Sequence, residues 1–406
     1  MTPAKQGETR PSQREGIGLC LSGGGFRASI FHIGALRRLH ELGILGKTRT
    51  VSSVSGGSIL SGFLANQMRA HGIEGGLQFS DWESQVAAPF RRFVSRDLRT
   101  WPILAHAAWN WLLPGLRVNH LIRLYRRRLT ERQISELPPV PEFVFCASDL
   151  TFGVNWEFRR ERSGDYEAGY AKKASGWPLA RAVAASACFP PIFGPMPVNL
   201  EPADFTGGAY AGAGRAGLLK SIKLSDGGVY DNMGIEPVWR NHAYVLVSDC
   251  GAPFQFRPAT FVISTLARYT GVVQNQALAL RKRLFFSDLN EGRYRGAYWA
   301  LNGSTEKYQR KGRTGLPGYP PALVAEVINP IRTDLDGFTE AEICVLENHG
   351  YLLAEASVAR RVPEIVVSGA PDVKVPHPDW MSESLVRKEL ASSGRRLSLK
   401  RLLKLL

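Results

Sequence analysis

Val51-Ser-Ser-Val-Ser-Gly-Gly-Ser58 has the pattern of a strand that ends in a tight turn and opens a helix. Its β-branched start favours a strand, and the apolar positions that follow, at 59, 60, 63 and 64, recur at helical spacing. A serine presented at such a corner needs small residues two places before and two places after it, and Ser53 and Gly57 meet this need. The segment predicts a nucleophile elbow that presents Ser55. The alternative is an ordinary Gly/Ser turn at a helix start.

The composition is that of a globular protein with an anionic partner. The chain has 406 residues, of which 44% are apolar and 21% charged, and a net charge of +15. This charge indicates a membrane surface or a nucleic acid. Five scattered cysteines suggest neither a disulfide framework nor a zinc site, and we expect no metal or cofactor. Because we find neither a signal-peptide core nor an apolar run of about twenty residues, we expect a cytoplasmic protein with peripheral membrane association.

A glycine-rich loop, Ser22-Gly-Gly-Gly-Phe-Arg27, separates an apolar strand at 17–21 from a helical pattern that reaches Leu42. Consecutive glycines at a helix N-terminus let backbone N–H groups face outward and stabilise an anion. A flexible loop is one alternative, and a nucleotide site is a weak one because G-x-G-x-x-G is missing. We favour an oxyanion hole, since a nucleophile candidate follows after one crossover helix. The Arg27 guanidinium would hold the loop or add positive potential.

Two aspartates follow apolar segments late in the chain. Asp226-Gly-Gly228 comes after Ile222-Lys-Leu-Ser225, and a carboxylate at such a strand end can turn into a cleft. An Asp-Gly hairpin turn is the alternative. Asp249, at the end of the apolar strand 244–249, is the rival carboxylate.

Two basic segments suit a water–lipid interface. Residues 91–132 hold ten arginines against two acids, and this segment includes Trp101, Trp109 and Trp111. We interpret it as a lid or membrane-contact insertion; a buried helix is the alternative, and no recognised fold supports nucleic-acid binding. The second segment, near the C-terminus, predicts a basic amphipathic helix for anionic membrane, or else a frayed terminal helix; its cations are Arg395, Arg396, Lys400, Arg401 and Lys404.

Two further helices are expected in the second half. Residues 261–286 predict a helix whose exposed side carries Arg268, Arg281, Lys282 and Arg283. Thr339, with Glu342 three residues on, predicts an N-cap with a capping box. That helix contains His349, for which a structural role outweighs that of a base. Residues 294–301 and 322–328 are candidates for further strands.

Three of these blocks together resemble a known family. The blocks at 22–27, 53–57 and 226–228, in this order and spacing, resemble the patatin-like phospholipases, which are related to cytosolic phospholipase A. Ala185-Ser-Ala-Cys-Phe-Pro190 and Glu347-Asn-His-Gly-Tyr351 also look like that family. The resemblance covers roughly residues 16–360 and implies an α/β fold, a three-layer α/β/α patatin-like sandwich with a mainly parallel central sheet.

The resemblance also implies a Ser–Asp dyad without a histidine base. Carried over to this chain, Ser55 is the nucleophile and Asp226 the base. The oxyanion hole would be formed by the amides of Gly23, Gly24 and Gly25, with Arg27 nearby. Two positions depart from the family pattern: Ser22 stands where plant members often have aspartate, and Ser53 replaces the elbow glycine. The implied organisation is a disordered arm at 1–15, a patatin-like domain at 16–365 and a tail at 366–406.

The activity expected from this resemblance is hydrolysis of ester-linked fatty acids in phospholipids or lysophospholipids through an acyl-serine. An anionic membrane surface is the expected partner, nucleic acid is not, and an activating protein is left open. One alternative is a Ser–His–Asp esterase with His242 or His349 as base. The others are an acyltransferase with the same acyl-enzyme and a non-catalytic membrane-binding protein with the same fold.

Overall fold

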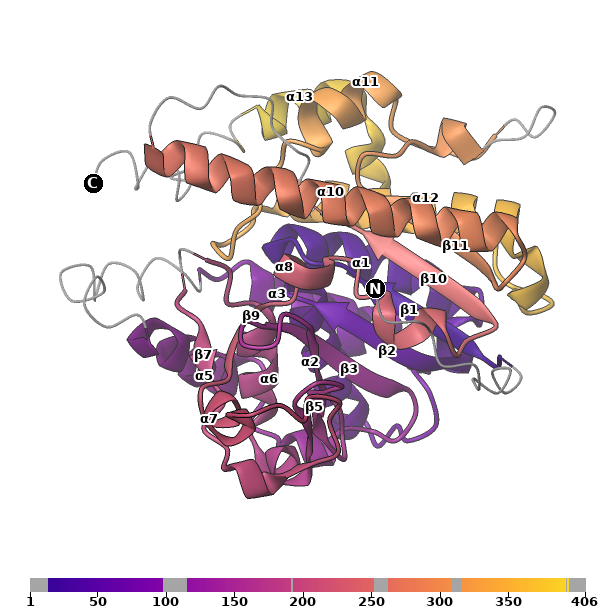
Figure 1. The fold of residues 1–406 in the computed structure, drawn as a ribbon. Coiled ribbons are helices and arrows are strands. Elements are labelled where there is room, and N and C mark those ends of the chain that lie inside the picture. The colour runs from indigo at the N-terminus through magenta and orange to yellow at the C-terminus, as the bar shows by residue number, and fades with distance from the viewer. Residues whose placement is uncertain are drawn as a thin grey trace.

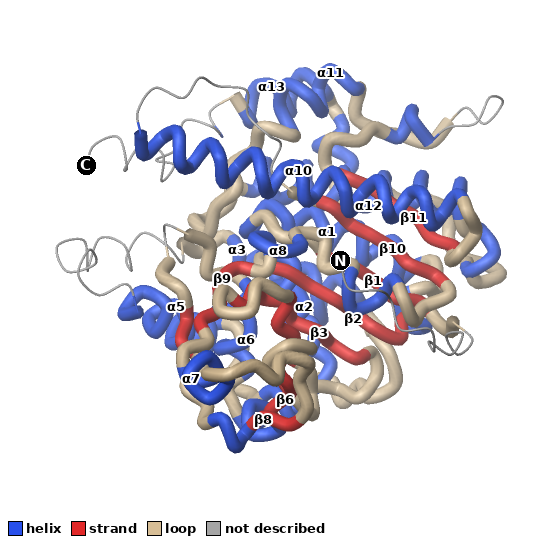
Figure 2. Tube along the Cα trace, in the orientation of Figure 1, coloured by secondary structure: helices blue, strands red, loops and turns tan. Residues whose placement is uncertain are grey.

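A mixed sheet runs through the middle of the molecule, and its parallel half carries the strand pattern predicted above (Figures 1 and 2). The computed structural model describes residues 14–97, 115–190, 193–251, 262–308, 315–391 and 393. Five neighbouring strands are mutually parallel, in the order β11, β10, β1, β2, β3. They span Arg295–Ala300 (β11), Tyr244–Asp249 (β10), Ile17–Leu21 (β1), Thr48–Val54 (β2) and Glu142–Asp149 (β3).

Antiparallel strands extend the sheet beyond β3. One series continues from β3 in the order β4 (Asn155–Phe158), β5 (Ser163–Asp165), β6 (Gly169–Ala171) and β8 (Phe205–Thr206). A second branch consists of β9 (Lys223–Asp226), which pairs with β3, and β7 (Met196–Pro197), which pairs with β9. β9 therefore brings Asp226 to the parallel half of the sheet.

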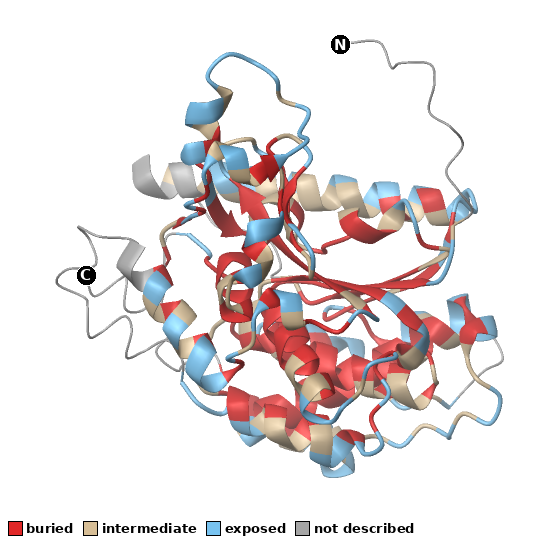
Figure 3. Cartoon of the chain, turned by 90° about the horizontal axis from the view of Figure 1, so that it is seen from below, coloured by how far each residue is buried: buried red, intermediate tan, exposed pale blue. Residues whose placement is uncertain are grey.

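Helices cover both faces of the parallel half because its strands are apolar on both sides. Leu19 and Leu21 of β1 point into the larger core with α1 (Gly25–Glu41), α2 (Gly56–Ala70) and α12 (Glu340–Arg361). Cys20 points the other way, into a smaller core under α9 (Glu236–Trp239) and α10 (Val262–Asn290). Figure 3 shows the strands buried between these layers. The predicted three-layer α/β/α sandwich with a mainly parallel sheet is confirmed.

Shorter helices complete the described chain. They are α3 (Ala88–Val94), α5 (Gly115–Arg128), α6 (Leu179–Ser186), α7 (Arg215–Lys220), α8 (Gly228–Asp231), α11 (Pro321–Leu323) and α13 (Glu383–Leu390). Within the described ranges, no helix is both long enough and apolar enough to cross a bilayer.

The secondary-structure predictions were right for most elements and wrong for one. Thr339 caps α12 as expected: its hydroxyl accepts from the Glu342 amide, and the Glu342 carboxylate accepts from the Thr339 amide. The segment 322–328 is helical, not a strand, because Pro321 is preset for a first helical turn. Residues 366–391, expected in the tail, pack on the domain: Val386 and Leu390 of α13 belong to the larger core.

Two glycines let α1 and α12 approach backbone to backbone. A Cβ added to Gly34 of α1 would lie 2.0 Å from the carbonyl oxygen of Glu347, and one added to Gly350 of α12 would lie 1.9 Å from that of Phe31. Real Cβ atoms do not approach oxygen so closely, so the helices would have to separate. This contact fixes the position of α1, the helix that directly follows the glycine loop.

We expect Gly34→Ala to lower the free energy of unfolding by about 1–3 kcal/mol, the usual cost of overpacking a core. Gly271→Ala is the matched control, because Gly271 also lies inside a helix, α10, and an added Cβ there meets nothing within 4 Å. That control should be neutral or more stable than wild type by about 0.5–1 kcal/mol. Urea unfolding measures both variants, and equal stabilities would contradict the close helix contact.

Candidate active site

Two strands meet end to end along one edge of β3. The first half of that edge pairs with β2, up to Val54 opposite Cys146. From the next residue the edge pairs with β9, which runs the other way and places Asp226 opposite Ala147. Because β2 turns away from the edge where β9 ends, Ser55 and Asp226 become neighbours although they are distant in sequence. The Ser55 hydroxyl lies close enough to the Asp226 carboxyl to lower the pKa of Asp226.

Ser55 adopts the strained corner that the elbow pattern predicted. Its φ is 51° and its ψ −114°, a region that a residue with a side chain rarely occupies. The two glycines that follow allow the turn: a Cβ on Gly56 would lie 2.1 Å from the Gly25 carbonyl oxygen, and one on Gly57 would lie 2.2 Å from that of Leu21. The backbone of the elbow is therefore in close contact with β1 and the glycine loop.

Ser53 fits where the family pattern has glycine. It is fully buried, its hydroxyl donates to the Val144 carbonyl at 3.3 Å, and it accepts from the Ser58 hydroxyl at 3.1 Å. A buried hydroxyl with partners on both sides costs little. The departure from the family pattern is therefore accommodated.

Ser186 supports the elbow from below, a role that we did not assign from the sequence. Its hydroxyl accepts from the Ser55 amide at 2.9 Å and donates to the Cys146 carbonyl at 2.6 Å. The same segment also holds β9, since the Gly227 amide donates to the Ser186 carbonyl and the Asp226 amide to the Cys188 carbonyl. The only sequence signal was the family resemblance of residues 185–190.

Asp226 has the environment of a general base. It is 2% exposed, and one carboxylate oxygen accepts from the Gly228 amide at 2.7 Å. Burial raises the pKa of Asp226 to about 7, while the hydrogen bonds from Gly228 and Ser55 lower it in part. A carboxylate that titrates near neutral pH can accept a serine proton far better than one that titrates near 4.

The rival carboxylate, Asp249, is in the opposite situation. It pairs with Lys282 at 2.6 Å, and it accepts from the Tyr298 hydroxyl at 2.6 Å and from the Gly251 amide at 2.9 Å. Burial raises its pKa, but Lys282 and the other donors outweigh burial, so the pKa lies below the usual range. Asp249 is therefore a structural anion.

The two histidines considered as bases are also engaged elsewhere. His242 bonds the Thr50 hydroxyl at 2.9 Å and the Val238 carbonyl at 3.0 Å, and Thr50 lies about 16 Å up the strand from Ser55. His349 bonds the Leu301 carbonyl at 2.8 Å, and burial lowers its pKa to about 4. Both have structural roles, as we favoured for His349.

The glycine loop leaves two amides for an anion. The Gly23 amide donates to the Asn232 carbonyl at 3.0 Å, so it is already engaged, contrary to the expected role. The amides of Gly24 (φ 143°) and Gly25 (φ 60°) have no acceptor among the described residues. The amide of Gly56, directly after the nucleophile, likewise has none there, and this position is a common oxyanion donor.

Arg27 holds the loop and does not face the elbow. It is 2% exposed, and its guanidinium donates to the carbonyls of Cys250 at 3.0 Å, Ile331 at 2.9 Å and Asn329 at 3.3 Å. Of the two roles considered for Arg27, the geometry matches the holding role. The expected part in an oxyanion hole is limited to positioning.

His32 supports the loop from within α1. Its Nε2 donates to the Ser22 carbonyl at 2.9 Å, and its Nδ1 accepts from the Ser248 hydroxyl at 2.7 Å. The carbonyl can only accept, so Nε2 carries a proton, and in the neutral ring Nδ1 is the acceptor. Burial lowers the pKa of His32 to about 4, which keeps the ring neutral at physiological pH.

The membrane residues predicted from the sequence lie outside the described residues. These are Trp101, Trp109, Trp111, Arg395, Arg396, Lys400, Arg401 and Lys404, and their contact with lipid stays a prediction. Within the ranges that the structure describes, no cluster of three His, Cys, Asp or Glu residues is arranged to hold a metal.

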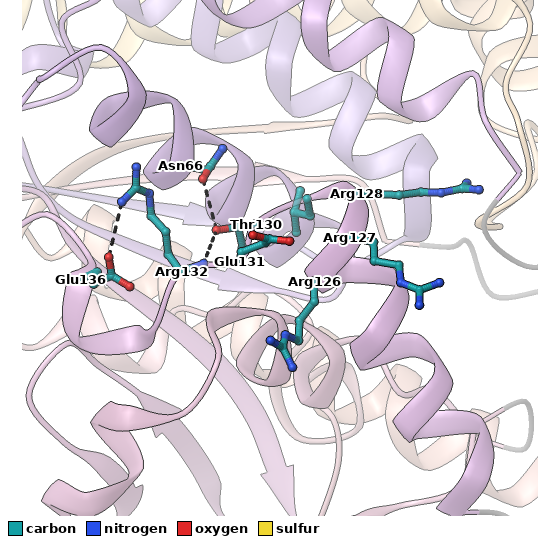
Figure 4. A pocket seen from close by; sticks show the side chains of 9 residues that line it. Asn66, Arg126, Arg127, Arg128, Thr130, Glu131, Arg132 and Glu136 are labelled. Carbon is teal, nitrogen blue, oxygen red and sulfur yellow. Dashed lines mark hydrogen bonds and ion pairs between the residues drawn. The ribbon is translucent and has the colours of Figure 1, made fainter.

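A cavity of about 530 Å³ lies at the end of α5, apart from the dyad (Figure 4). Its lining includes Arg126, Arg127 and Arg128, whose side chains point in different directions in Figure 4. Arg132 is paired there with Glu136 at 3.4 Å. Because the arginines do not converge, the cavity does not form a defined anion site.

Comparisons with known proteins cover the region of the three motif blocks. The family model of the patatin-like phospholipases matches residues 19–239, more than half of the chain. No curated protein matches the sequence.

Solved structures match this chain at low identity and with low TM-scores. The chain is similar to human GIVD cytosolic phospholipase A2 in complex with methyl gamma-linolenyl fluorophosphonate inhibitor and terbium chloride, with 13% identity and a TM-score of 0.48 over 96% of this chain and 61% of that chain. Human GIVD cytosolic phospholipase A2 alone gives 12% identity and a TM-score of 0.44, over 95% and 64%. VipD from Legionella pneumophila gives 15% and 0.36, over 86% and 68%. The chain thus spans less than two thirds of the human protein.

The raised pKa predicts how Asp226→Asn changes stability with pH. Because the folded-state pKa of about 7 lies above the unfolded value, the Asp226 contribution is full at low pH and is lost as the pH rises through 7. Asparagine keeps the acceptor for Gly228 but never ionises. We therefore expect the free energy of unfolding of the variant, relative to that of wild type, to increase by about 2 kcal/mol when the pH is raised from about 5.5 to about 8.5. Urea unfolding at both pH values measures this; a difference that is independent of pH would contradict the raised pKa.

Proposed function

Because this chain belongs to the patatin-like phospholipase family, as its motif blocks predicted, we propose that it hydrolyses ester-linked fatty acids of membrane phospholipids or lysophospholipids. The observation that carries the proposal is the strand junction along β3, which places a strained serine beside a buried carboxyl whose pKa burial raises to about 7. An exposed Gly/Ser turn would have no reason to contain either feature. The product would be a free fatty acid.

The first half of the reaction forms an acyl-serine. The Asp226 carboxylate accepts the Ser55 hydroxyl proton as the oxygen attacks the ester carbonyl carbon. Negative charge then develops on the carbonyl oxygen, and the amides of Gly24, Gly25 and Gly56 are the donors for it. One well-placed donor of this kind contributes about 3–4 kcal/mol to the transition state. Collapse of the tetrahedral intermediate expels the alcohol, which takes the proton from Asp226.

The second half releases the fatty acid. Asp226 accepts a proton from water, the water oxygen attacks the acyl-serine carbonyl, and Ser55 leaves with the proton. The same base serves both halves because its pKa lies near the working pH. No metal or cofactor is needed for these steps. The protein would act at the membrane surface as a peripheral protein. Activity of the purified chain on vesicles would show that it needs no activating protein.

The decisive experiment is fatty-acid release from mixed phospholipid vesicles. We expect Ser55→Ala and Asp226→Asn to lose activity by a factor of at least about 10³, since each removes a group that acts in the transition state. Asp372→Asn is the matched control, since Asp372 is exposed and plays no part in the dyad. If Asp226→Asn stays active while Ser55→Ala is inactive, the base is another residue. If wild type releases no fatty acid from any lipid tested, the result would favour the alternative of a non-catalytic membrane-binding protein.

The pH profile and a histidine variant test the base separately. We expect kcat/KM to rise with pH through about 7, because Asp226 must be ionised to accept the serine proton. His349→Gln should keep this profile if it keeps its fold. A folded His349→Gln variant without activity would favour the Ser–His–Asp alternative.

A further inference from the structure

The outer face of α10 is apolar, where we had expected it to be basic. Five of the nine large hydrophobic side chains that are exposed in the described residues lie on this one helix. They are Tyr269 (66% exposed), Val272 (41%), Val273 (68%), Leu280 (58%) and Leu284 (42%). Such a concentration on one element is not the scatter of single apolar residues found on ordinary surfaces.

These side chains form a continuous stripe. At 100° per residue, Tyr269, Val273, Leu280 and Leu284 fall within an arc of about 60° over a length of about 22 Å. Figure 1 shows α10 along the outside of the molecule. We call these four residues, together with Val272, the α10 stripe.

Two of the four cations expected on that face, Arg281 and Lys282, turn inward instead. Lys282 pairs with the buried Asp249 at 2.6 Å, and Arg281 lies 3.8 Å from Asp231 and 4.5 Å from the centre of the Tyr230 ring. Because a buried carboxylate needs a counter-charge, Asp249 and Asp231 attract these two side chains toward the interior. The inner face is also anchored by Phe285, which is 1% exposed in the smaller core.

The charge of α10 identifies what this face fits. α10 has four basic residues, of which Arg283 is exposed beside the stripe, and one acidic residue, Asp288, which is buried and pairs with Arg293 at 2.9 Å. An apolar stripe with an exposed cation and no exposed carboxylate of its own helix beside it suits the headgroup–acyl boundary of an anionic bilayer. A second copy of the chain would bring Arg283 of each copy to the same face, and the net charge of +15 opposes such self-association.

We infer that the α10 stripe is the surface by which this protein docks on anionic lipid bilayers. The helix packs on α8, the turn that directly follows Asp226. Docking through the stripe would therefore hold the dyad edge of the sheet near the bilayer. This last point rests on the proposed function; the docking itself does not.

The test is cosedimentation of the full chain with phosphatidylcholine vesicles that contain phosphatidylglycerol. Val273→Ser/Leu280→Ser removes apolar surface without changing charge and should weaken binding about tenfold. Val140→Ser/Leu150→Ser is the matched control, because these residues are exposed to 44% and 51% on other elements, and it should bind as wild type does. Equal binding by the stripe variant and wild type would overturn the inference.

Two further measurements separate the remaining outcomes. Light scattering of the free protein tests the competing occupant: a wild-type dimer that dissociates in the stripe variant, without vesicle binding, would assign the stripe to a second copy and overturn the inference. Ser55→Ala should bind vesicles as wild type does while releasing no fatty acid. Vesicle binding that depends on the stripe would support the docking inference even if the hydrolase proposal failed. A lack of hydrolase activity would contradict the proposed function but not the docking.

Discussion

The exchange of strands along one edge of β3 is the constraint on which the site depends. β2 occupies that edge up to Cys146, and β9 occupies it from Ala147. A parallel and an antiparallel neighbour can share an edge only if one ends where the other ends, and the two ends are the elbow and Asp226. The Ser186–Cys188 segment bonds to both ends and so keeps the junction closed. Geometry of this kind holds two reacting groups in place before any substrate arrives.

Burial then separates the roles of two similar carboxylates. Asp226 and Asp249 both end strands of the same sheet and are almost equally hidden, at 2% and 3% exposure. Asp249 has the ammonium of Lys282 beside it and is held as an anion. Asp226 has a hydroxyl and an amide in place of a cation, so desolvation dominates and its pKa lies near neutral. One counter-ion therefore distinguishes a structural anion from a candidate base.

Residues of the late family-like motif serve the fold and not the chemistry. Glu347 pairs with Arg91 at 2.8 Å and His377 at 2.7 Å, His349 bonds a carbonyl, and Gly350 gives α1 its approach to α12. The glycine loop rests on α1, and His32 of that helix fixes the Ser22 carbonyl. Pattern similarity finds such residues as readily as catalytic ones, because both kinds are constrained. Only their contacts tell them apart.

The sequence by itself determined the local geometry: which serine could occupy a strained corner, where amides could be left bare, and where Thr339 would start a helix. These depend on backbone angles and side-chain size within a few residues, which the sequence states directly. The tertiary structure decided which amides and carboxylates have partners, and that α10 faces outward with apolar side chains. Among the described residues, the Gly23 amide has an acceptor and the Gly56 amide has none, while Asp249 has a cation beside it and Asp226 has none. Each of these depends on a partner from a distant part of the chain, because hydrogen-bond acceptors, counter-ions and burial are assembled only when the sheet forms.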